Sequence, residues 1–269
     1  MTKNEICILL PSGVRAETGK KYPVLWLLHG ATCDYDDFLQ KEHVPEMLRG
    51  HEVMVVMPSG LNSDFANHME FGGGFAYTDF LMDELMPYIY SYFPASDDPE
   101  DNFLAGFSMG GAAALMLALY RPECFGRVAV LGSTVRESEF LQPYLDWTGE
   151  EFRAAATADP TRFPTEFGNP ERGITRKEIN MIARYQTVRD YVDSMECTWE
   201  RFAERAGEGR VPSMLFCCGD QDGCCEKVKE FRKSADNMGV NTISYEYIPG
   251  YGHDRADVTI QKAIEWFGI

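Results

Sequence analysis

The chain has 269 residues, 45% of them hydrophobic, which is enough to bury one large core in a single domain. Aspartate and glutamate number 42 against 25 lysines and arginines, and the formal charge of −17 disfavours nucleic acid and anionic membrane surfaces as partners. The early apolar run from Ile6 to Leu10 is too short for a signal peptide, and no later run is long enough to span a membrane, so we expect a soluble cytoplasmic protein.

Short apolar runs alternate with helical patterns along the chain. We predict strands near residues 6–10, 24–28, 53–57, 102–107, 128–132, 213–218 and 243–248. This alternation predicts an α/β fold with a mostly parallel sheet and helices on both faces. Pro87 interrupts a helical pattern over residues 77–93, so we expect a kink or a restart of the helix there.

The hexapeptide at residues 106–111, Gly-Phe-Ser-Met-Gly-Gly, places Ser108 two positions from a glycine on each side. It follows an apolar strand and precedes a segment rich in alanine and leucine, Met109 to Tyr120, which is the context of a nucleophile elbow. A Cβ at Gly106 or Gly110 would collide with neighbouring chain in so sharp a turn. We therefore predict that Ser108 is a catalytic nucleophile.

Residues 136–210 break the alternation, because they lack a clear strand and mix charged with aromatic side chains. We interpret this segment as a helical cap inserted over the active site. The alternative is an ordinary helical excursion that only covers the sheet.

A serine hydroxyl needs a general base and a group that orients the base. The members run in the order serine, acid, histidine when the serine lies in such an elbow, and His253 is the only histidine after Ser108. His253 is therefore the predicted base. The closing segment, residues 256–267, is predicted to be a helix that packs Ile260, Ile264 and Phe267 on the sheet.

The four remaining histidines precede the serine, and we interpret them as structural or surface residues: His29, His43, His51 and His68. His29 and Gly30 end a strongly apolar strand where an oxyanion donor is expected. Even there, the useful group is a backbone N–H.

Two aspartates compete for the role of the acid. Asp220 and Asp222 follow the strand at 213–218, at the carboxyl end where open parallel sheets place their reacting groups. We favour Asp222, because three residues past Gly219 the chain has left the strand and can turn a carboxylate toward a loop histidine. Asp220 remains the alternative, and one of the two is expected to be a turn aspartate bonded to its own backbone.

The eight cysteines do not predict a metal or disulfide site. Cys217 and Cys218 lie in an apolar strand, where cysteine acts as a small buried hydrophobe, and no C-x-x-C spacing occurs in the chain. We expect reduced thiols and no cofactor.

With these residues the chain resembles the esterase D-like branch of the α/β-hydrolases, which includes S-formylglutathione hydrolases, feruloyl and acetyl-xylan esterases and tributyrin-type carboxylesterases. The resemblance spans nearly the whole chain, and the matching segments are residues 20–30, 56–60, 83–89, 103–111, 118–133, 217–222 and 250–254. It implies the α/β-hydrolase fold, with Asp222 as the acid and His253 as the base. It also implies an oxyanion hole formed by the backbone N–H groups of Ala31 and Met109.

One departure from the family affects the pocket. Many relatives carry an aromatic residue two positions after the catalytic histidine, where this chain has Arg255. We therefore expect a more polar pocket wall near His253.

Together these features predict a serine carboxylesterase, one domain over residues 1–269 with a cap at 136–210, that hydrolyses short-chain acyl esters, including acetyl or feruloyl esters of carbohydrates. The triad would be Ser108, Asp222 and His253. The alternatives are a thioesterase of the S-formylglutathione hydrolase kind, an acyltransferase, and a non-catalytic binding protein of the same fold. The expected partner is a small ester, with homo-oligomerisation left open.

Overall fold

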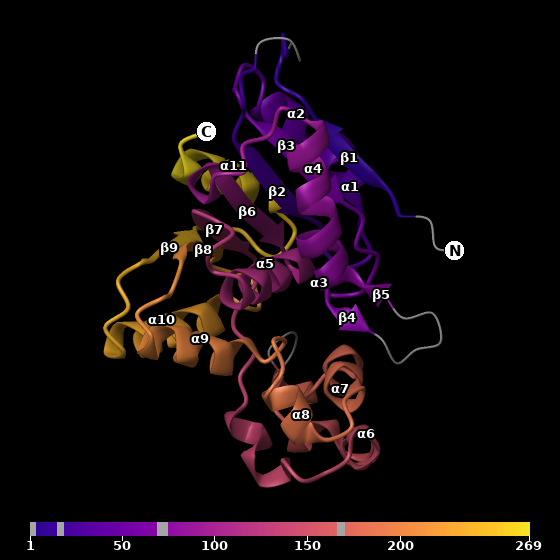
Figure 1. Cartoon of the computed structure of the whole chain (residues 1–269). Coiled ribbons are helices and arrows are strands. Elements are labelled where there is room, and N and C mark those ends of the chain that lie inside the picture. The colour runs from indigo at the N-terminus through magenta and orange to yellow at the C-terminus, as the bar shows by residue number, and fades with distance from the viewer. Residues whose placement is uncertain (1–3, 15–18, 69–74, 166–169) are drawn as a thin grey trace.

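A seven-stranded sheet forms the centre of the computed structural model, which describes residues 4–14, 19–68, 75–165 and 170–269 (Figure 1). The strand order is β1-β3-β2-β6-β7-β8-β9. The strands are β1 (Ile6–Leu9), β2 (Val24–Leu28), β3 (Met54–Pro58), β6 (Asn102–Phe107), β7 (Arg127–Leu131), β8 (Ser213–Gly219) and β9 (Ile243–Ile248). Only the β1–β3 pair is antiparallel among these neighbours, so the predicted mostly parallel sheet is confirmed.

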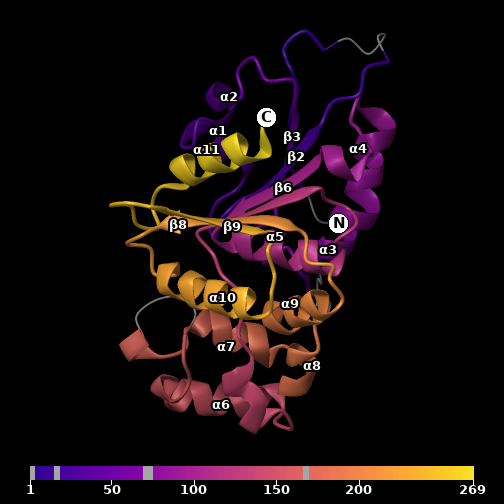
Figure 2. The same ribbon diagram turned by 90° about the vertical axis from the view of Figure 1, so that its left-hand side faces the viewer.

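Helices cover both faces of the sheet (Figure 2). The α-helices are α1 (Tyr35–Gln40), α2 (Val44–Met47), α3 (Tyr77–Asp79), α4 (Met86–Tyr92), α5 (Met109–Tyr120), α6 (Gly149–Ala158), α7 (Arg176–Ala183), α8 (Val188–Val192), α9 (Thr198–Gly207), α10 (Cys225–Asn237) and α11 (Ala256–Phe267). Helices α1, α2 and α11 pack on one face, and α4, α5, α9 and α10 pack on the other. Short 3₁₀ turns at residues 99–101, 139–144, 160–162 and 170–172 and a small ribbon of β4 (Asn67–His68) and β5 (Phe75–Ala76) complete the elements.

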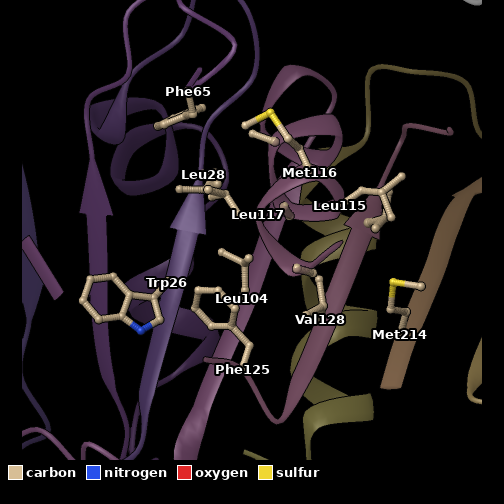
Figure 3. Packing of buried hydrophobic residues seen from close by; sticks show 14 of the residues in the cluster. Trp26, Leu28, Phe65, Leu104, Leu115, Met116, Leu117, Phe125, Val128 and Met214 are labelled. Atoms are coloured by element: carbon tan, nitrogen blue, oxygen red, sulfur yellow. The ribbon is translucent and has the colours of Figure 1, made fainter. Parts of the chain in front are cut away.

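Alternate side chains of each central strand enter the two apolar layers. Val24, Trp26 and Leu28 of β2 join the layer beneath α5, whereas Leu25 and Leu27 join the layer beneath α11. Figure 3 shows Trp26 and Leu28 among the side chains that fill the space between the sheet and α5. Because both faces are covered, the strands are continuous apolar runs, which is the pattern from which they were predicted.

The helical segment that contains Pro87 is irregular, as predicted. Helix α3 passes into a π-helical turn at Phe80–Leu85, and α4 begins at Met86 with Pro87 in its first turn. Pro87, which has no N–H to donate, comes directly after this turn, in which the Met86 N–H donates to the Leu81 carbonyl five positions back. The helix does not end and begin anew at Pro87, because Leu85 and Met86 keep helical backbone angles, and the predicted interruption takes the form of the π-helical turn.

The described residues of the segment 136–210 form four α-helices, which divide into two groups. Helices α6, α7 and α8 share an apolar cluster of their own, which includes Phe152, Phe163 and Tyr191, and they lie beyond the sheet layers in Figure 1. Helix α9 instead packs on α5, where Arg205 Nε donates to the Leu119 carbonyl at 2.9 Å.

Helix α11 closes the chain as expected, with Ile260, Ile264 and Phe267 buried against the sheet. Within the described ranges, no helix combines the length and the apolar character needed to cross a membrane.

Candidate active site

Ser108 occupies the sharp turn between β6 and α5. Its backbone has φ 56° and ψ −114°, a conformation that residues other than glycine rarely adopt. The Ser108 N–H donates to the Leu131 carbonyl at 2.8 Å, and the Ala112 N–H donates to the Ser108 carbonyl at 3.0 Å. These bonds hold a strained serine at the carboxyl end of a central strand.

The flanking glycines allow three elements to meet at this turn. A Cβ on Gly106 would lie 2.2 Å from the Gly110 carbonyl oxygen, and a Cβ on Gly110 would lie 2.0 Å from the Leu28 carbonyl oxygen. Both distances are far below any van der Waals contact. The steric reason given for glycine at these two positions is therefore confirmed.

A continuous hydrogen-bonded chain links Ser108, His253 and Asp222. His253 Nε2 lies 2.8 Å from Ser108 Oγ, and His253 Nδ1 lies 2.8 Å from Asp222 Oδ2. An ionised aspartate only accepts hydrogen bonds, so Nδ1 carries the proton and Nε2 is left to accept from the serine hydroxyl. Phe107, whose ring centroid is 5.0 Å from that of the imidazole, packs beside His253.

Asp222 is far more buried than His253, because 3% of the Asp222 side chain is exposed against 48% of the His253 side chain. Burial acts to raise the pKa of Asp222, but hydrogen bonds from the His253 ring and the Cys224 N–H outweigh burial and hold the pKa below its usual value. Asp222 is therefore ionised at neutral pH.

Asp220 is placed differently. Its Oδ1 accepts the Gly250 N–H at 2.8 Å, and its side chain lies on the exposed side of the loop. Of the two candidates, Asp222 contacts His253, and Asp220 joins its loop to the turn after β9, 30 positions along the chain. The aspartate that bonds its own local backbone is Asp222, whose Oδ1 accepts the Cys224 N–H at 3.0 Å.

Ala31 and Met109 line the same cavity as Ser108 and His253. Among the residues that the structure describes, no acceptor is bonded to either backbone N–H. Two donors with no acceptor beside a serine hydroxyl are the arrangement that an oxyanion requires.

The cavity beside Ser108 has a volume of about 190 Å³. Its apolar wall is built by Ala31, Met109, Ala112 and Met181. Its polar wall comes from residues of the 136–210 segment, namely Arg136, Thr175, Lys177 and Glu178. Helix α7 thus supplies Met181 to the apolar part of the lining, and Lys177 and Glu178 to the polar part.

A network of charged side chains, which the sequence did not reveal, includes Arg136 and Lys177 of the cavity lining. The Asp64 carboxylate lies 2.8 Å from Lys177 Nζ and 3.4 Å from Arg136 Nη2. On its other side, Arg136 lies 3.9 Å from Glu196, which also pairs with Arg184. Burial acts to raise the pKa of Asp64, but the charges of Arg136 and Lys177 outweigh it and lower the pKa.

Arg255 does not form the polar wall that we expected from it. Its guanidinium pairs with Asp257 at 2.8 Å and lies 4.7 Å from the ring centroid of Tyr251, and it does not line the cavity. The polarity near His253 comes instead from the 136–210 segment.

One cysteine contacts the Ser108–His253–Asp222 hydrogen bonds, because the Cys224 N–H donates to Asp222 Oδ1. The other histidines lie elsewhere in the fold. His29 is buried at the end of β2, His43 precedes α2, His51 is exposed, and His68 lies in β4. None of the eight cysteines, all of which lie in the described residues, is in a disulfide bond. Across the described stretches of the chain, no three His, Cys, Asp or Glu side chains come together as a metal site.

Known proteins share this sequence pattern over most of the chain. The model of a family described as "Putative esterase" matches residues 2–255. An acetyl esterase of Caldicellulosiruptor saccharolyticus is 24% identical over 243 residues, which are 90% of this chain and 82% of that protein. An esterase of Mycobacterium tuberculosis is 25% identical over 255 residues, but the chain spans only about half, 51%, of its length.

Solved structures share the fold. FphF, a fluorophosphonate-binding serine hydrolase of Staphylococcus aureus, has a TM-score of 0.72 and 24% identity over 97% of this chain and 91% of its own. The S-formylglutathione hydrolase FrmB of the same organism has a TM-score of 0.70 and 22% identity over 98% and 92%. A ferulic acid esterase has a TM-score of 0.67 and 21% identity over 98% and 90%. The predicted α/β-hydrolase fold is confirmed.

Proposed function

Since this chain belongs to the Esterase family and is a hydrolase of carboxylic esters, we propose that it cleaves short-chain acyl esters through a triad of Ser108, His253 and Asp222. The observation that carries the proposal is the hydrogen-bonded chain, with 2.8 Å at each of its two links. The same three side chains were predicted from the sequence for these roles.

The reaction is acyl transfer to water. His253 Nε2 accepts the proton of Ser108 as its Oγ attacks the ester carbonyl carbon, and the backbone N–H groups of Ala31 and Met109 stabilise the oxyanion. His253 then donates that proton to the leaving alcohol, which leaves an acyl group on Ser108. Water, activated by the same imidazole, releases the acid. Asp222 keeps the proton on Nδ1 and stabilises the imidazolium.

The dimensions of the cavity favour a small acyl group. A volume of about 190 Å³ is below the range of about 300–1,000 Å³ usual for ligand pockets, and the wall beside Ser108 is apolar. Elsewhere in the lining, the buried Glu178 carboxylate is already bonded to the Thr165 hydroxyl and the Thr175 N–H. The groups that can bond to a hydroxylated alcohol are Lys177, half of whose side chain is exposed, and the Thr175 hydroxyl. An acetyl ester of a carbohydrate fits both walls, and the likeness to an acetyl esterase and a ferulic acid esterase supports this class.

The segment 136–210 acts as the cap in this proposal, within a single domain. Its helices α6 to α8 have their own apolar cluster, and its residues line the cavity from Arg136 to Met181. The part that covers the serine is therefore α7, whereas α9 covers the sheet.

A thioester is the second candidate substrate. The fold is shared with an S-formylglutathione hydrolase, and the proposed triad would attack a thioester carbonyl in the same way. Comparing an acetyl thioester with an acetyl oxygen ester, with and without an added alcohol as acceptor, separates thioesterase, esterase and acyltransferase activity.

The direct test of the proposal is Ser108→Ala. Hydrolysis of p-nitrophenyl acetate should fall on the order of 10⁴ to 10⁶ in kcat, because the nucleophile is lost while the fold is kept. A fluorophosphonate probe should label the wild-type protein at Ser108 and leave the variant unlabelled. Ser91→Ala, which alters a hydroxyl on α4, is the control and should keep both activity and labelling. Ser108→Ala activity within about tenfold of wild type would exclude Ser108 as the nucleophile.

A further inference from the structure

Backbone strain gathers in two turns beside the proposed oxyanion hole. In the described part of the chain, six residues other than glycine have positive φ. Four of them lie in the turns that follow β2 and β3, namely Thr32 (64°), Leu61 (52°), Asp64 (56°) and Phe65 (54°), and a fifth is Ser108. Such conformations persist only where surrounding contacts enforce them, and they cluster at functional sites.

Two side-chain hydrogen bonds join these turns. The Gly60 N–H donates to His29 Nε2 at 2.8 Å, and the Thr32 N–H donates to Asn62 Oδ1 at 2.7 Å. Because His29 Nε2 accepts, its Nδ1 carries the proton, and Nδ1 donates to the Gly30 carbonyl at 2.8 Å. The turn after β3 therefore contacts the chain on both sides of Ala31.

These contacts act on the two peptide planes that flank Ala31. The Gly30 carbonyl and the Ala31 N–H belong to one planar trans peptide and point in opposite directions. The bond from His29 to that carbonyl thus orients this plane from the buried side. The next plane contains the Thr32 N–H, and the oxygen of Asn62 holds it from the exposed side.

We propose that Asn62 is a positioning residue of the oxyanion hole, which anchors the peptide that follows Ala31, while His29 anchors the preceding peptide that carries the Ala31 N–H, so that Ala31 is held on both sides. The inference rests on the function proposed above. Without the Asn62 oxygen, water can satisfy the exposed Thr32 N–H, so the fold survives, because one such bond contributes only about 0.5–1.5 kcal/mol to stability. What the variant loses is the alignment of the Ala31 N–H with the oxyanion, and transition-state stabilisation is far more sensitive to this alignment than the fold is.

The test compares Asn62→Leu, which keeps the shape of the side chain and removes the acceptor, with Asn62→Asp, which keeps an acceptor oxygen. We expect kcat for p-nitrophenyl acetate to fall about tenfold to a hundredfold in Asn62→Leu with KM within about twofold, since removal of a whole oxyanion donor costs about 10² to 10³. Affinity for a short-chain trifluoromethyl ketone, whose adduct with Ser108 carries the oxyanion, should fall by the same factor. The kcat and ketone affinity of Asn62→Asp should lie within about threefold of the wild-type values when all variants are assayed in about 1 M NaCl, which screens the added charge.

Asn67→Leu is the matched control, because Asn67 also accepts a backbone N–H, that of Thr78 at 3.0 Å, without contacting the turn of Ala31. It should lower the melting temperature at most and leave kcat and ketone affinity unchanged. Equal impairment of Asn62→Leu and Asn62→Asp, or a change in KM alone, overturns the inference. If the wild type is active and Asn62→Leu has the same kcat and ketone affinity, this inference alone is overturned. If the wild type does not hydrolyse the ester, the proposed function is overturned with it.

Discussion

Asp222 and Asp220 are two residues apart, and their contacts assign them different tasks. Asp222→Asn should lower kcat by about 10³ to 10⁴, because an amide in that position favours the wrong imidazole tautomer of His253. Asp220→Asn makes the same chemical change and keeps an oxygen for the Gly250 N–H, so activity should stay near that of wild type. Steady-state kinetics on p-nitrophenyl acetate measures both.

The opposite ranking of the two variants would transfer the acid role to Asp220. Circular dichroism of each variant checks that the loop substitution has not unfolded the protein, so that a loss in kcat reports on chemistry alone.

The residues that sequence reasoning identified are those with a local signal. Ser108 has the glycine spacing of an elbow, and His253 is the only histidine that follows it. Asn62, Arg136 and Lys177 have no such signal, because they reach the site only when the turn after β3, the segment after β7 and helix α7 fold against it. Their roles depend on contacts between segments far apart in the chain, which no local pattern encodes.

At the level of elements, the site depends on close contact between β2, β6 and α5. The Gly110 position in α5 lies against the Leu28 carbonyl of β2, and β2 leads directly to Gly30 and Ala31. Helix packing and the proposed oxyanion donors are therefore coupled through one glycine.

Gly110→Ala should disturb stability and activity together. The new Cβ would lie 2.0 Å from the Leu28 carbonyl oxygen, so strand or helix must move, and overpacking of this kind costs about 1–3 kcal/mol. Gly207→Ala in α9 is the control, because its Cβ would meet no atom within 4 Å and alanine favours the helix by up to about 1 kcal/mol. Urea unfolding measures the stability of both variants, and hydrolysis of p-nitrophenyl acetate measures their activity. A Gly110→Ala protein as stable and active as wild type would show that this contact relaxes freely.

Elements with a clear period were predictable, and the division of the 136–210 segment was not. Each central strand is an apolar run bounded by turn residues, so the strands were found from the sequence alone. Within 136–210, Phe202 of α9 and Phe152 of α6 both lie in amphipathic helical patterns that look alike in the sequence. Phe202 nevertheless joins the core between the sheet and α5, whereas Phe152 joins the separate cluster of α6 to α8. Which core an apolar side chain joins depends on the tertiary path of the chain.

At the scale of the whole molecule, two apolar bodies meet at the proposed active site. Helices α6 to α8 lie together, apart from the sheet and its helices (Figure 1). The sheet and its helices carry the proposed triad, and α7 carries Lys177, Glu178 and Met181 of the cavity lining. The Asp64 pairs with Arg136 and Lys177 cross between them. We therefore expect the distance between α7 and Ser108 to determine the size of the substrate that the enzyme accepts.

The dependence of kcat/KM on the length of the acyl chain should report how closely α7 approaches Ser108. We expect kcat/KM to be highest for acetyl to butyryl esters and to fall beyond about six carbons, because each methylene that the cavity cannot bury forgoes about 0.8 kcal/mol and adds a clash. Met181→Ala should shift the optimum to longer chains, since Met181 lines the cavity from α7. Ile179→Ala shortens a buried side chain on the same helix that does not line the cavity, so it should weaken the cap without moving the optimum. Wild-type rates that climb steadily to about ten or twelve carbons would mean that α7 leaves a long groove open beside Ser108.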